Sequence, residues 1–167
     1  MPDLGAGNFN TNTAGVLRVG WDDSFITGVS LEDGQVIYQV CFDNVSQAME
    51  DLPITFSGNP TSIEVVDDQS NLITPAFING SLTMTCGDTG GEDNGGEDNG
   101  GDTGGESTSD LTFIAANATA TCGEQMCTDI TVQGFNNVLS FQYSIVWDAA
   151  TLGQATVQGF GIPDITA

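Results

Sequence analysis

The chain contains no histidine, no lysine and a single arginine, Arg18, among its 167 residues. The absence of histidine excludes a Ser/His catalytic pair and histidine-ligated zinc, and it removes the most common general base. The absence of lysine excludes Schiff-base chemistry and a Walker-type phosphate site. Carboxylate chemistry and the binding of hard cations such as calcium remain. An enzyme is therefore the least expected class of protein.

Positive charge is nearly absent, whereas 23 Asp and Glu residues give a formal net charge of −22. Such a polyanion repels nucleic acid and anionic membrane surfaces, so neither is an expected partner. The sequence has no run of 18 apolar residues, so no membrane insertion is expected. Residues 1–5 lack a basic start and an apolar stretch, so no signal peptide is predicted there.

The four cysteines are Cys41, Cys86, Cys122 and Cys127. We expect two disulfides in an oxidising compartment rather than four reduced core thiols, because abundant Gly, Asn, Thr and Ser also indicate an extracellular or cell-surface protein. Counting alone leaves three pairings open.

A low-complexity segment at 87–110 separates two blocks, 1–86 and 111–167. It has 9 Gly, 8 acidic residues and no apolar residue in 24 positions. A segment with nothing to bury is expected to be a flexible, solvated linker. Its short Gly-Gly-Glu-Asp-Asn repeat lacks the spacing of an EF-hand, which makes a calcium site the weaker interpretation.

Both blocks consist of short segments that alternate apolar and polar residues between turns rich in Gly, Asn, Asp and Pro. This pattern predicts an all-β, antiparallel sandwich or barrel, with one helical turn at 46–51. The predicted strands lie at 16–21, 36–42, 54–57, 63–66, 81–85, 111–115, 128–133, 138–147 and 155–158.

The two ends of the sequence share a pattern. Ile-Pro-Asp-Ile-Thr-Ala at 162–167 matches Met-Pro-Asp-Leu-Gly-Ala at 1–6, with Pro, Asp and Ala identical in register. Such self-similarity predicts a tandem repeat whose complete domain runs through 111–167 into 1–86 of the next copy, about 143 residues in all. The alternative is that the blocks pair within one chain as a circular permutant, and the linker is long enough for both.

The most distinctive motifs are Trp-Asp at 21–22 and 147–148 and Gly-Val-x-Leu-x-Asp-Gly at 28–34, with further matching stretches at 31–42, 59–65, 127–148 and 159–164. In the order 111–167 then 1–86, these residues resemble the cohesin-like β-sandwich modules of giant surface and extracellular proteins of Bacteroidetes-type bacteria. The resemblance implies a jelly-roll sandwich of about nine strands, the first and last of which lie side by side and parallel.

The resemblance also bears on the cysteines. Parallel first and last strands would bring Cys86 and Cys122 to one end of the domain and leave Cys41 to pair with Cys127. The main rival pairing is Cys122 with Cys127 and Cys41 with Cys86. Either preferred bridge would join the two blocks.

The resemblance implies a non-catalytic structural repeat of a filament or adhesive appendage, such as the hook-bearing filaments of marine predatory bacteria. Neighbouring repeats of the same protein would then be the partners, in a homo-oligomeric filament, with a glycan or a protein as the adhesive target. The alternatives are a cohesin-type module that binds a dockerin-like partner and a carbohydrate-binding module. No cofactor is expected, except for calcium.

Two sets of acidic side chains are candidate sites. Asp22 and Asp23, with Asp148 after the other tryptophan, could form a glycosidase-like carboxylate pair, but strand capping and turn initiation are the better interpretation. A weak calcium site is conceivable at acidic turn residues, namely Asp22, Asp23, Asp67 and Asp68, with Asp43 as a further ligand.

The aromatic residues at strand positions are interpreted as core rather than as a sugar-stacking face. They are Trp21, Phe42, Phe141, Tyr143 and Trp147. In the strand at 138–147, the odd-numbered positions 141–145 are predicted to face the core and the even-numbered ones the solvent. Three Asn-x-Ser/Thr acceptor patterns begin at Asn44, Asn79 and Asn117 but carry little weight in a bacterial protein.

Overall fold

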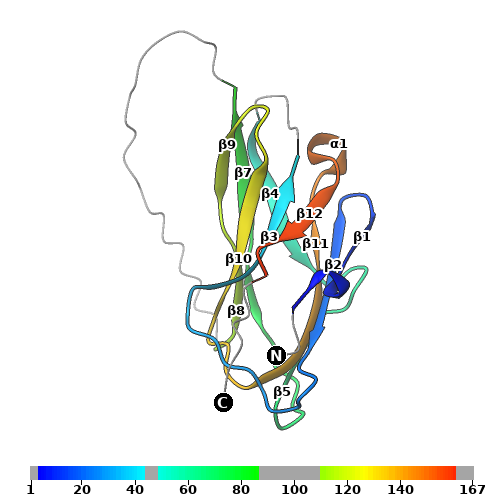
Figure 1. Cartoon of the computed structure of the whole chain (residues 1–167), viewed down its shortest axis with the longest axis vertical. Coiled ribbons are helices and arrows are strands. Elements are labelled where there is room, and N and C mark those ends of the chain that lie inside the picture. The colour runs from blue at the N-terminus through cyan, green and yellow to red at the C-terminus, as the bar shows by residue number, and fades with distance from the viewer. Residues whose placement is uncertain (1–3, 44–48, 87–109, 161–167) are drawn as a thin grey trace.

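The structure is a computed structural model that describes residues 4–43, 49–86 and 110–160. These residues form two β-sheets packed face to face, with one short α-helix and a single turn of 3-10 helix at Ala6–Asn8 (Figure 1). The predicted all-β sandwich is confirmed at this level. The predicted linker at 87–110 lies outside the described residues, except for Asp110.

Each sheet contains strands from both blocks. The first sheet has the order β1 (Phe9–Thr13), β2 (Val16–Asp22), β11 (Val138–Val146), β4 (Met49–Ser57), β7 (Gly80–Thr85) and β9 (Ala118–Thr121), and β5 (Glu64–Asp67) also pairs with β11. The second sheet has the order β12 (Ala155–Gln158), β3 (Gln35–Phe42), β10 (Met126–Gln133), β8 (Thr112–Ala115) and β6 (Ala76–Ile78). The central strands β11 and β10 come from block 111–167 and pair mainly with strands of block 1–86.

The alternation of the sequence decides which side chains enter the core. On β11, Phe141, Tyr143 and Ile145 are buried between the sheets, as predicted. Ser144, predicted to face solvent, is also fully buried. The reason is that a loop covers it: the backbone N–H of Thr61 donates to Ser144 Oγ at 3.1 Å.

The described part contains twelve strands, whereas the resemblance implied about nine. The three that were not predicted are β1, β6 and β9. Their sequences are mostly polar (FNTNT), very short (AFI), or alternate only the small residue Ala with Thr (ATAT). The helical turn predicted at 46–51 is wrong for 49–51, which begin β4 because Leu52, Ile54 and Phe56 continue a strand alternation; residues 46–48 lie outside the described part.

Two neighbouring stretches cross together from the second sheet to the first. One runs from β6 to β7 and the other from β8 to β9, and both strand pairs are parallel. The register keeps one offset throughout: Ala76 pairs with Thr112 and Thr85 with Thr121. At the crossing, a Cβ on Gly80 would lie 2.6 Å from the carbonyl oxygen of Ala116, so only glycine allows the close approach.

The side chains of two asparagines satisfy the backbone at this crossing. Asn79 Oδ1 accepts the N–H of Phe56 at 2.9 Å, and Asn117 Oδ1 accepts the N–H of Ser81 at 2.9 Å. These hydrogen bonds explain two of the three Asn-x-Ser/Thr patterns as structural features. The third, at Asn44, lies outside the described residues.

The core is one hydrophobic cluster that is rich in aromatic rings. Its rings include the five predicted core aromatics, each at most 8 % exposed, and further members missed by the prediction are Tyr38, Phe56, Phe113 and Phe135. The hydroxyls of Tyr38 and Tyr143, one from each sheet, are 2.9 Å apart within it. Burial raises the pKa of both tyrosines above the usual value, because the phenolate would lose its hydration.

Candidate functional site

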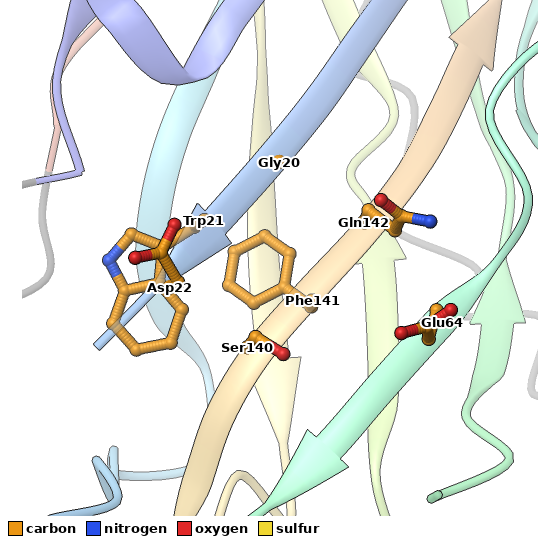
Figure 2. A pocket seen from close by; sticks show the side chains of 7 residues that line it. All are labelled: Gly20, Trp21, Asp22, Glu64, Ser140, Phe141 and Gln142. Atoms are coloured by element: carbon orange, nitrogen blue, oxygen red, sulfur yellow. The ribbon is translucent and has the colours of Figure 1, made fainter. Parts of the chain in front are cut away.

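A shallow hollow of about 310 Å3 lies on the outer face of the first sheet, where β2, β11 and β5 run side by side (Figure 2). Gly20 creates it, since nothing lies within 4 Å of the position that a Cβ would take there. Gln142 is paired with Gly20 on one side and with Glu64 on the other. Figure 2 shows Asp22 and Glu64 on opposite sides of β11, separated by Ser140 and Gln142.

The hollow offers polar groups but no aromatic platform. Trp21 and Phe141 lie beneath it, 3 % and 1 % exposed, and stack on one another with ring centroids 5.3 Å apart. Trp147 and Tyr143 are also buried. Their ring faces are therefore turned into the core, and the sugar-stacking alternative loses the planar aromatic row that it requires.

The three carboxylates considered for catalysis do not share a cleft. Asp22 is exposed at the end of β2, and Asp23, the next residue, is buried beneath a loop. Asp148 caps the short helix α1 (Ala149–Leu152), where its carboxylate accepts the Ala150 N–H at 3.0 Å and the Thr151 hydroxyl at 2.6 Å. These two hydrogen bonds hold the pKa of Asp148 below its usual value. In the structure, Asp23 and Asp148 have the capping and turn-forming role that the sequence favoured.

Asp23 organises the loop that follows β2. Its carboxylate accepts the backbone N–H groups of Phe25, Thr27 and Gly28 at 3.0–3.1 Å, and the hydroxyl of Thr27 at 3.1 Å. Burial opposes ionisation, but these hydrogen bonds outweigh it and hold the pKa of Asp23 below its usual value. The loop presents Phe25 and Ile26 to solvent, 67 % and 73 % exposed. The prediction missed this apolar loop, whose only sequence signal is two apolar residues inside a turn.

Three of the five acidic residues considered for calcium, Asp23, Asp43 and Asp67, accept hydrogen bonds from their own loops or from neighbouring side chains. Asp67 accepts the N–H groups of Gln69 and Asn71 at 2.9 and 2.7 Å. Asp43 Oδ1 accepts the side-chain amide of Gln125 at 2.6 Å. Asp68 lies beside Gly28, and Asp22 is exposed on the face of the hollow. Among the described residues, no three His, Cys, Asp or Glu side chains are grouped to hold a metal ion.

Two disulfides join the two blocks, and they are the pairs preferred from the sequence. Cys41 on β3 lies directly opposite Cys127 on β10, and the two are bonded. Cys86 and Cys122 follow the paired residues Thr85 and Thr121 at the ends of β7 and β9, and they are bonded as well. Two disulfides indicate an oxidising or extracellular environment for the folded chain.

A second hollow, of about 230 Å3, lies between the edge strands β1 and β12. Ala6 and Phe9 line it from the start of the chain, and Val157 and Phe160 line it from the end. The rings of Phe9 and Phe160 stack with centroids 5.5 Å apart. The first and last described segments of the chain therefore meet at this hollow, on one side of the sandwich.

Comparisons with protein-family models, with curated proteins and with solved structures found no match. Within the described part of the chain, no helix has the length and apolarity needed to cross a membrane. A function is therefore inferred from the geometry of the sandwich and the positions of its two disulfides.

Proposed function

We propose that the chain is a non-catalytic structural repeat of an extracellular tandem array, which builds a filament or an adhesive appendage at the cell surface. Each domain would consist of 111–167 followed by 1–86 of the next copy, and 87–110 would link successive domains. Neighbouring repeats of the same protein are then its principal partners.

The observation that carries the proposal is the position of the two linker attachment points, residues 86 and 111. Because β6–β7 and β8–β9 are parallel and in register, residue 111 is level with residue 75, just before β6, and residue 86 follows the end of β7. The eleven residue steps from 75 to 86 correspond to about 36 Å of parallel strand. Figure 1 shows β8 in the lower half of the molecule and β7 and β9 in the upper half. Linkers attached in this way leave from opposite ends, as a linear array requires.

The meeting of Phe9 and Phe160 supports the continuous order of the blocks. Leu4 is 3 % exposed and belongs to the core. It precedes Phe9 by five residues, and Ile165 follows Phe160 by five residues. If residue 165 of one copy is equivalent to Leu4 of the next, as the matching ends suggest, four residues between Phe160 and that position have only a short distance to span.

The acidity of the repeat fits an array of many copies. At −22 per 167 residues, like charges keep neighbouring modules soluble and apart, and salt screens this repulsion to within about 10 Å. A glycan or protein target at the array's end, and calcium as an accessory ion, remain part of the proposal without a site assigned to them.

Electron microscopy of native material, isolated with an antibody against residues 1–167, tests this function. We expect regular filaments with an axial repeat of one sandwich. Isolated monomers that bind a dockerin-like protein or a glycan would instead favour a recognition module and overturn the structural proposal.

A further inference from the structure

The Cys86–Cys122 bridge creates a short covalent path between the two linker attachment points. From residue 111 the path follows β8 and β9 to Cys122, crosses the disulfide and leaves at Cys86. Only residues 111–122 and Cys86 belong to it. Every strand other than β8 and β9 lies outside it, and of the aromatic core only Phe113 lies on it.

This path is already nearly as long as it can become. Residues 112–121 form extended strand over most of their length, at about 3.3 Å per residue. A fully stretched chain reaches at most about 3.6 Å per residue. Tension between residues 86 and 111 can therefore lengthen the path by only a few Å, and a force that gains no length does no work toward unfolding the sandwich.

We infer that Cys86–Cys122 carries tension between the two linkers past the fold, so that the sandwich itself is not pulled open. The inference rests on the proposed function, because tension between these two points arises in an array joined by its linkers. The constant register explains how the bridge forms: Cys86 and Cys122 continue the same offset that pairs Thr85 with Thr121.

The Cys41–Cys127 bridge has a different place in this scheme. It lies between β3 and β10 in the second sheet, and Cys41 is fully buried. A covalent path through it would follow residues 111–127 and then 41–86, about 50 residues more than the path through Cys86–Cys122. Stretching those residues would release about 170 Å of chain, because each contributes about 3.4 Å. This second bridge would hold the blocks together only after the domain had largely opened.

Single-molecule pulling on the whole chain tests the inference. A protease site is inserted into 87–110, the folded and oxidised protein is cut there, and handles are attached to the two new ends. Both bridges keep the cut chain in one piece. We expect the wild-type protein to show no unfolding step up to the force at which the handles fail. The double variant Cys86→Ser/Cys122→Ser should show a step of about 170 Å.

The matched control is Cys41→Ser/Cys127→Ser, which loses one bridge as well but keeps the short path, and it should resist like the wild type. An unfolding step in oxidised wild-type protein would overturn the inference, and so would a step of similar length in the matched control. If the Cys86→Ser/Cys122→Ser variant does not fold, a reductant added to tethered wild-type protein replaces it. Because Cys86 is exposed and Cys41 is fully buried, we expect a step of about 170 Å before the tether breaks, and a break without that step would overturn the inference. Because one chain is pulled, the outcome is independent of whether native filaments exist.

Discussion

The buried hydroxyl pair of Tyr38 and Tyr143 allows a sharp test of the core. The two oxygens are 2.9 Å apart, and each tyrosine is fully buried. Replacing either tyrosine by phenylalanine leaves the other hydroxyl buried without this partner. A buried polar group that loses its hydrogen bond costs about 1–3 kcal/mol of folding free energy. For a chain of this size, about 2 kcal/mol lowers the midpoint of thermal unfolding by roughly 4–8 °C.

The double variant Tyr38→Phe/Tyr143→Phe distinguishes the hydrogen bond from general packing. It leaves no orphaned hydroxyl, so its loss of stability should be no greater than that of one single variant, and the double-mutant cycle should give a coupling of about 1–2 kcal/mol. Chemical denaturation followed by circular dichroism measures all four proteins. If the single losses simply add in the double variant, or if neither single variant is destabilised, the hydroxyls do not form the pair described here.

Three other features yield predictions. The chain has only two tyrosines, both in this pair, and their folded-state pKa lies above the unfolded value of about 10. The stability that this pair contributes is therefore complete below pH 10 and falls above it. Phenolate absorbance at 295 nm should rise only together with unfolding, and a rise in folded protein would contradict the burial. Asp23→Ala removes the hydrogen bonds that order its loop and should lower the free energy of unfolding by about 1–3 kcal/mol at pH 7. Because the folded-state pKa of Asp23 is lowered, this loss of stability relative to wild type should shrink as the pH falls below about 4. A loss that stays constant with pH would refute this account. Gly80→Ala should lower the free energy of unfolding by about 1–3 kcal/mol, since its Cβ would meet backbone oxygens at the crossing. The control Gly20→Ala places its Cβ in open space and should change stability far less. Equal losses of stability in thermal unfolding would contradict the close approach at Gly80.

The sequence was most informative where apolar residues alternate with polar ones. The strands around Trp21 and Phe141 could be predicted because one face of each is buried and the pattern records it. The capping role favoured for Asp148 agrees with the structure because an acidic residue at the start of a turn accepts nearby N–H groups through local geometry alone. In both cases the determining interactions involve neighbours in the sequence or one repeated period.

The features that were missed depend on contacts distant in the sequence. Strands β1 and β9 lack an alternation of large apolar residues, and each pairs with a neighbouring strand that offers hydrogen bonds. The burial of Ser144 depends on the loop that contains Thr61. The paired crossing between sheets is recorded in the sequence only as Gly80 between two apolar segments, which is also how an ordinary turn appears.

In the candidate site, too, the sequence predicts local features but not those that depend on residues distant in the chain. The sequence drew attention to acidic turns, which in the structure mainly order their own loops, and it did not anticipate the hollow over Gly20. This hollow arises because Gly20, Ser140 and Gln142 come together on adjacent strands. A preference for the observed disulfide pairs was within reach only because the resemblance supplied a parallel arrangement of the terminal strands.

The central claim is that one 111–167 block and one 1–86 block form a single sandwich closed by two bridges. The most direct test is disulfide mapping of the oxidised protein after Glu-specific digestion without reductant. The seven glutamates place the four cysteines in separate peptides, 33–50, 65–92, 107–124 and 125–167. Mass spectrometry should find 33–50 linked to 125–167, and 65–92 linked to 107–124. A link between 107–124 and 125–167, or free thiols in the folded protein, would contradict the account.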